Sequence, residues 1–136
     1  MTPPAIVLSH TQMGENIGSA ARAMKNFGLR ELVLIAPRCG WPNERAQVLA
    51  SGAADIIAQA KVFATAAEAL ASYNLVLATT ARGRDVVKDI HTPAAGAARL
   101  RAAGAAGSRT AILFGNERAG LDNVEMSLAD AVITIP

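Results

Sequence analysis

An acid–base pair bracketed by glycines, Glu117-Arg118, follows a predicted buried strand at residues 111–114. Open α/β sheets bind their ligands at the carboxyl ends of the strands, so this position favours a ligand-binding loop. Gly115 either adopts a backbone conformation closed to other residues or lets a ligand come close, and Gly120 has the same options at the far end of the loop. The alternative for this pattern alone is an ordinary strand–turn–helix connection with a surface ion pair.

A second polar loop follows the predicted strand at residues 75–78 and repeats the pattern with two hydroxyl groups and two arginines. Arginines gathered on one rim of a fold contact nucleic-acid phosphates and make binding sensitive to salt. Each arginine taken alone is better explained as solvated surface. His10 also follows a predicted strand, although a lone histidine there is more often structural than catalytic. The loop residues concerned are Thr79, Thr80, Ala81, Arg82 and Arg84.

Continuous aliphatic runs that alternate with helical segments must position these loops. Such runs are typical of strands buried on both faces, and their alternation with helices predicts an α/β fold. We therefore expect one domain over residues 1–136, with a mostly parallel sheet and helices on both faces. The predicted strands are 5–8, 32–35, 61–63, 75–78, 111–114 and 131–135. The predicted helices are 16–27, 44–50, 53–60, 66–72 and 94–106, with a short helix starting at 121–123 and capped by Asp122.

The first predicted helix carries a cluster of polar residues. Asn16 is a good N-cap for a helix that runs to about Phe27, and Gly28 then ends it as the C′ residue. Arg22 falls on a face separate from the apolar stripe. That stripe comprises Ile17, Ala20, Ala21, Met24 and Phe27.

Composition excludes several classes of protein. The chain of 136 residues is 51% hydrophobic and 18% charged, which is typical of a domain with a real core. Its formal net charge of +2 permits a polyanionic partner without demanding one. The single cysteine, Cys39, excludes an intrachain disulfide and a cysteine-ligated metal, so we expect no metal. We expect a cytoplasmic protein, because no signal peptide and no apolar run of about 20 residues is visible.

Two segments together resemble a known family. Residues 16–23, with Asn16, Gly18 and Arg22, resemble motif one of the SPOUT methyltransferases, and residues 114–121 resemble their motif two. The chain is most similar to the SpoU (TrmH/TrmJ-like) branch. The resemblance implies a homodimeric, S-adenosylmethionine-dependent enzyme that methylates ribose 2′-oxygens of tRNA or rRNA. For the TrmJ-like branch, it implies cytidine or uridine in the tRNA anticodon loop.

The resemblance also implies roles for individual residues. Arg22 matches an arginine usually given a catalytic role, and we interpret it as a phosphate anchor and a stabiliser of the developing alkoxide, because a guanidinium does not readily lose its proton. We expect Glu117 to orient an arginine or to accept a hydrogen bond from the substrate. The implied catalytic residues are Arg22, Asn16 and Glu117. The implied cofactor-binding residues are Thr79, Thr80, Ala81, Gly115 and Ile135, and the implied RNA contacts are Arg82, Arg84 and Arg118.

The family continues beyond the position of Pro136 with an asparagine-rich third motif and a final helix, which close a trefoil knot and complete the cofactor pocket. These segments are not among the 136 residues, so the resemblance implies that this chain lacks the knot-forming part. The alternative function is a non-catalytic RNA-binding or dimerisation domain with an incomplete cofactor site.

Overall fold

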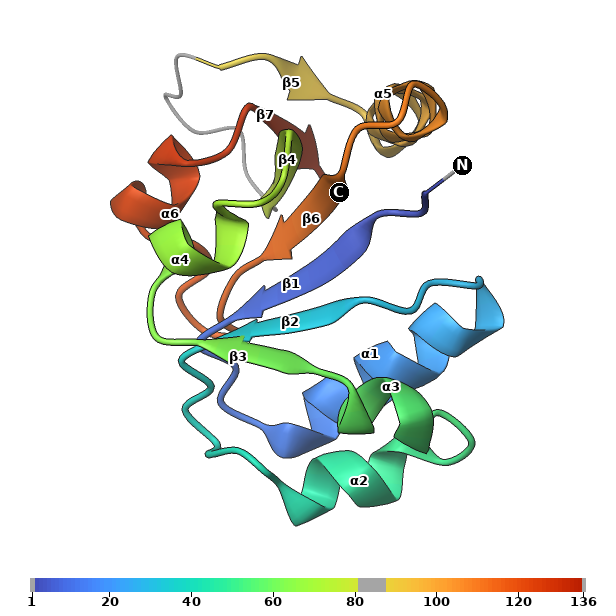
Figure 1. Cartoon of the computed structure of the whole chain (residues 1–136). Helices are drawn as coiled ribbons and strands as arrows, with labels where there is room; N and C mark the ends of the chain where they lie inside the picture. Colours follow the sequence, from blue (N-terminus) through green and yellow to red (C-terminus); the bar gives the residue numbers. More distant parts are fainter. Residues whose placement is uncertain (1, 81–87, 136) are drawn as a thin grey trace.

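The structure, a computed structural model, describes residues 2–80 and 88–135. Within these residues lies a seven-stranded sheet (Figure 1). Its strands are β1 (Ala5–Ser9), β2 (Leu32–Ile35), β3 (Lys61–Phe63), β4 (Leu75–Thr80), β5 (Ile90–His91), β6 (Thr110–Phe114) and β7 (Ala131–Thr134). The spatial order is β3-β2-β1-β6-β4-β7-β5, and every neighbouring pair is parallel. The predicted parallel sheet is therefore confirmed.

Continuous aliphatic runs form the middle of the sheet because both of its faces are covered. All four residues of β2 are buried, and so are Val7 of β1 and Leu113 of β6. The sequence did not predict β5, a two-residue strand at the sheet edge whose Ile90 is half exposed. Such a strand leaves no pattern of hydrophobicity long enough to detect.

Helices cover both faces of the sheet, as predicted. One face carries α1, α2, α3 and α5, and the other carries α4 and α6 (Figure 1). The bounds are α1 (Gly14–Asn26), α2 (Glu44–Ala50), α3 (Ala54–Ala58), α4 (Ala66–Leu70), α5 (Pro93–Ala105) and α6 (Asn123–Ser127).

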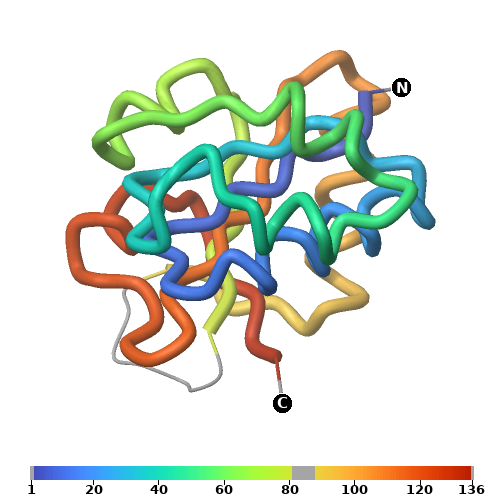
Figure 2. Tube along the Cα trace, turned by 90° about the horizontal axis from the view of Figure 1, so that it is seen from below, coloured from blue at the N-terminus to red at the C-terminus, as the bar shows by residue number. Residues whose placement is uncertain are grey.

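The helices α1 and α2 lie side by side in both views (Figures 1 and 2). Gly18 of α1 is buried at their contact. A Cβ atom added there would lie 2.5 Å from the carbonyl oxygen of Ala46 and 2.7 Å from the Cβ atom of Leu49. The absence of a side chain at Gly18 therefore sets how closely the two helices approach.

The ends of α1 differ in part from the prediction. The helix begins at Gly14 after Met13, so the prediction that Asn16 is the N-cap is wrong. Phe27, predicted to be buried, is 82% exposed at the C-cap, where the helical periodicity no longer directs it to the core. Gly28 has a φ of 73°, a left-handed conformation that suits a C′ glycine, as predicted.

Candidate functional site

The carboxyl ends of β4, β6 and β7 meet at one edge of the sheet. The hydroxyl of Thr79 donates to the carbonyl oxygen of Leu113 at 3.2 Å, and the amide of Ile135 donates to the carbonyl oxygen of Thr80 at 2.9 Å. Because β4 lies between β6 and β7, the loops that bear Thr79, Gly115 and Ile135 are neighbours. This arrangement follows from the mostly parallel sheet expected from the sequence, because parallel strands place their carboxyl ends at one edge. Ala81, Arg82 and Arg84 lie outside the described residues.

The glycine-bracketed loop after β6 closes on itself. Asn116 and Gly120 form an antiparallel bridge with N···O distances of 3.2 and 3.0 Å. A Cβ atom at Gly115 would lie 2.4 Å from the carbonyl carbon of Gly120 and 2.5 Å from the amide nitrogen of Leu121. Glycine is therefore needed at position 115 so that two segments of this loop can touch. Of the two glycines that bracket this loop, Gly115 and Gly120, only Gly120 has a left-handed backbone, with a φ of 70°.

Glu117 connects this loop to the start of α1. Its carboxylate accepts hydrogen bonds from the amide of Gln12 at 2.9 Å, the amide of Met13 at 3.0 Å and the side chain of Asn16 at 2.8 Å. The amides of Gln12 and Met13 come directly before α1, where the helix dipole favours a negative charge. Glu117 thus provides the anionic acceptor for the start of α1, and Asn16 donates to it from the first turn.

These hydrogen bonds lower the pKa of Glu117. Partial burial alone would raise its pKa, but the amide of Gln12, the side chain of Asn16 and further backbone donors hold the pKa below its ordinary value. Glu117 is therefore a carboxylate at neutral pH. The sequence predicted that Glu117 orients an arginine or accepts a hydrogen bond from the substrate. Within the described chain its hydrogen-bond donors are the Gln12 and Met13 amides and Asn16, and no arginine is among them.

The two predicted arginines that the structure describes, Arg22 and Arg118, are exposed. Neither guanidinium has a hydrogen bond or an ion pair among the described residues, although the Arg118 amide donates to the side chain of Asn116 at 2.9 Å. Arg22 is exposed on α1 and does not belong to the buried stripe that contains Ile17 and Ala21. Both charges are thus available to a ligand.

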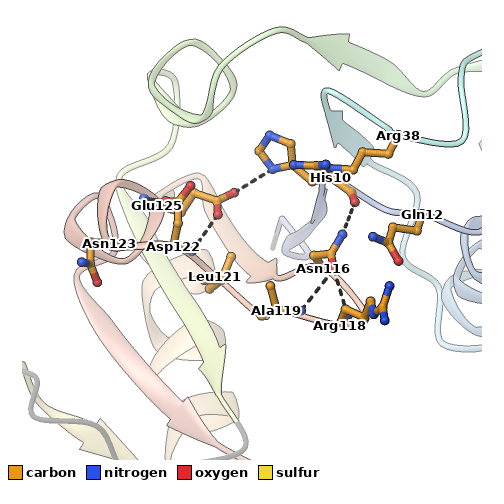
Figure 3. Close-up of a pocket in the computed structure, with 11 residues that line it drawn as sticks. His10, Gln12, Arg38, Asn116, Arg118, Ala119, Leu121, Asp122, Asn123 and Glu125 are labelled. Atoms are coloured by element: carbon orange, nitrogen blue, oxygen red, sulfur yellow. Dashed lines mark hydrogen bonds and ion pairs between the residues drawn. The ribbon is translucent and has the colours of Figure 1, made fainter.

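A polar pocket of about 530 Å³ opens beside the glycine-bracketed loop (Figure 3). Its wall combines the loops after β1, β2 and β6 with the start of α6. The lining residues are His10, Gln12, Arg38, Asn116, Arg118, Ala119, Gly120, Leu121, Asp122, Asn123 and Glu125.

A buried polar cluster underlies this pocket, and sequence reasoning missed most of it. Glu125 is 3% exposed and accepts a hydrogen bond from the hydroxyl of Ser9, which also contacts Nδ1 of His10 at 2.8 Å. Asp122 caps α6 as predicted, and it forms a reciprocal capping box with Glu125. The Asp-x-x-Glu spacing of residues 122–125 was a usable signal for this box, but Ser9 and Arg38 had none.

Within the described residues, no group of three or more His, Cys, Asp or Glu side chains could hold a metal ion. No helix of residues 2–80 and 88–135 is long and apolar enough to cross a membrane.

The fold and the site define a parallel α/β domain in which two motif loops meet at the carboxyl edge of the sheet. The family model of the SpoU rRNA Methylase family matches residues 3–136. The chain belongs to this family.

Individual relatives agree with this assignment. The chain is 40% identical over 131 residues to tRNA (cytidine/uridine/adenosine-2′-O-)-methyltransferase TrmJ of Pseudomonas aeruginosa, covering 96% of this chain and 51% of that protein. It superposes on the crystal structure of TrmJ from Z. mobilis ZM4 with a TM-score of 0.92 and 50% identity, covering 98% of this chain and 58% of that one. The chain spans about half the length of the curated relatives it matches.

A more distant structure shares the fold alone. It is the SpoU methyltransferase AviRb from Streptomyces viridochromogenes in complex with AdoMet, with a TM-score of 0.70 and 18% identity over 98% of this chain and 48% of that one.

Proposed function

We propose that the protein containing this chain is an S-adenosylmethionine-dependent 2′-O-methyltransferase that acts on tRNA, at cytidine or uridine in the anticodon loop. One observation carries the proposal: Glu117, in motif two, holds the start of the helix that bears Asn16 and Arg22, in motif one. Hydrogen bonds thereby link the two motifs within the chain. The name of the Pseudomonas relative, which specifies 2′-O-methylation of tRNA, supports the choice of reaction and substrate.

The loops after β4, β6 and β7 fit the cofactor in part. They bring the hydroxyl of Thr79, the backbone around Gly115 and the 42% exposed side chain of Ile135 to one edge of the sheet. Backbone groups and an exposed aliphatic side chain suit an adenine ring, so we assign Thr79, Thr80, Gly115 and Ile135 to cofactor binding, together with Ala81 from its sequence position. Bound S-adenosylmethionine would supply an activated methyl group to this site.

Arg22 is the residue that we assign to the reacting ribose. A guanidinium keeps its proton at neutral pH, so Arg22 binds a phosphate as a planar fork and stabilises negative charge that develops on the 2′-oxygen. Asn16 and Glu117 position the helix that carries Arg22. Arg118, with Arg82 and Arg84 from their sequence positions, would contact the RNA backbone.

We further propose a cytoplasmic homodimer in which each site is completed across a two-fold axis. The support is the exposed Arg22 side chain, which has no partner within the described chain and lies on an element separate from the cofactor loops.

Transfer of labelled methyl groups to bulk tRNA tests the proposed function, with the modified nucleotide mapped afterwards. We expect a 2′-O-methylated cytidine or uridine in the anticodon loop. RNA binding without methyl transfer by the full-length protein would instead support the non-catalytic RNA-binding domain.

A further inference from the structure

The pocket beside the glycine-bracketed loop is built around His10, to which neither motif assigns a role. His10 has a φ of 54°, in the left-handed region that side-chain-bearing residues rarely adopt. Its amide donates to the carbonyl oxygen of Ile35 at 2.8 Å, and its carbonyl oxygen accepts from the side chain of Asn116 at 2.6 Å (Figure 3). Contacts from two flanking segments thus hold this backbone conformation, and strained residues of this kind concentrate at binding sites.

The buried cluster also fixes the orientation of the imidazole. Nδ1 of His10 lies 2.8 Å from the Ser9 hydroxyl oxygen and 3.5 Å from a carboxylate oxygen of Glu125, an environment that favours a proton on Nδ1. In the neutral imidazole, Nε2 is then the unprotonated nitrogen. It has no hydrogen-bond partner among the described residues, and the side chain is 30% exposed in the pocket wall. His10 therefore presents a hydrogen-bond acceptor to the pocket.

Charges of both signs line the pocket, from the carboxylates of Asp122 and Glu125 and the guanidinium groups of Arg38 and Arg118. The carboxylates of Asp122 and Glu125 already accept each other's backbone amides at 2.7 and 2.9 Å in the capping box. Arg38 and Arg118 are exposed, and their guanidinium groups have no partner within the described residues. The amide of Arg38 is tied to the carbonyl oxygen of Thr11 at 2.9 Å, which anchors Arg38 next to the His10 loop. The two guanidinium groups are therefore available to bind an anionic group of a ligand, such as a phosphate.

We infer that this pocket binds a ribonucleotide unit of the RNA that adjoins the methylated nucleotide. Arg38 and Arg118 bind its phosphate, and Nε2 of His10 accepts a hydrogen bond from its ribose 2′-hydroxyl. Arginine is suited to phosphate, and a 2′-hydroxyl donor distinguishes RNA from DNA. A volume of about 530 Å³ is sufficient for one nucleotide. The identity of the RNA rests on the function proposed above.

The test measures binding of a tRNA anticodon stem–loop to the full-length protein, with a series of probes that each carry one 2′-deoxyribose outside the methylated nucleotide. For the wild-type protein, we expect one flanking deoxy substitution to weaken binding about tenfold. His10→Asn, which tolerates the left-handed backbone, should bind the natural RNA about tenfold more weakly and should not distinguish that deoxy probe.

Arg38→Ala should weaken binding and reduce the slope of log affinity against log salt by about one. Exposed Arg101 on α5 does not line the pocket, so Arg101→Ala is the matched control and should leave RNA affinity and methylation unchanged. His10→Asn and Arg38→Ala should each raise KM for tRNA with little effect on cofactor affinity, which a merely structural defect would not do.

If His10→Asn still distinguishes the deoxy probe, or if Arg38→Ala keeps the wild-type salt slope, the inference is wrong. If the wild-type protein binds the stem–loop with these signatures but transfers no methyl group, the proposed function is wrong and the binding pocket stands. If the wild-type protein methylates the tRNA but no flanking deoxy substitution weakens binding, the proposed function stands and the inference about the pocket is wrong.

Discussion

The guanidinium of Arg22 has no partner in the described chain, so its loss should affect the reaction and not the fold. In the full-length protein we expect Arg22→Ala to lower the methylation rate about 10²-fold or more, with cofactor affinity nearly unchanged. Arg22→Lys should also be poor, because an ammonium group cannot reproduce the planar fork. Methyl transfer to bulk tRNA and calorimetric cofactor binding measure the two effects, with exposed Arg30→Ala as control. A loss of cofactor binding alone would assign Arg22 to the cofactor pocket.

Protonation of the Glu117 side chain is coupled to folding. Its pKa is depressed in the folded protein, so its contribution to stability is complete above the ordinary value of 4.5 and is lost as the pH falls through the depressed pKa. We expect Glu117→Gln to lower the free energy of unfolding at pH 7 by about 1 kcal/mol, as for a lost N-cap. Denaturant titrations of both proteins should converge in acid. A difference that does not change with pH would contradict this account.

At the scale of secondary-structure elements, Gly18 decides how closely α2 packs on α1. Alanine is the better helix former by about 1 kcal/mol, yet we expect Gly18→Ala to destabilise the protein by about 1–3 kcal/mol. Its Cβ atom would overlap the carbonyl oxygen of Ala46. Ser19→Ala, at the adjacent exposed position, is the control and should be neutral or slightly stabilising. Thermal unfolding of the two variants measures the difference, and a stabilised Gly18→Ala protein would show that the helices separate at little cost.

At the scale of the whole molecule, the proposed dimer shares its sites between protomers. Arg22→Ala removes a contact to the substrate, whereas Ile135→Asp places a charge where the cofactor is expected; its backbone amide can still donate to Thr80. If each site combines Arg22 of one protomer with Ile135 of the other, a mixture of the two inactive variants should regain about a quarter of wild-type activity. Subunit exchange followed by the methyl-transfer assay measures this recovery. No recovery in verified heterodimers would show that each site lies within one protomer.

The order of strands and helices was predictable because it depends on local patterns. Aliphatic runs such as Leu32–Ile35 reproduce the observed strand bounds, and Gly28 and Asp122 end or begin helices through contacts with neighbours in the sequence. The meeting of Thr79, Gly115 and Ile135 at one edge also followed, because parallel strands place their carboxyl ends together.

Contacts between distant segments decided the rest. The start of α1 depends on Glu117, about a hundred residues away, and this is why local capping rules wrongly selected Asn16. The orientation of His10 depends on Glu125, which becomes its neighbour only when α6 packs beside the end of β1.

Sequence by itself determined the class of fold and the residue types at the sheet edge, because hydrophobic periodicity and helix signals act over a few residues. Only the tertiary structure decided which hydrogen bonds those residues make, because their partners come from elements far apart in the chain.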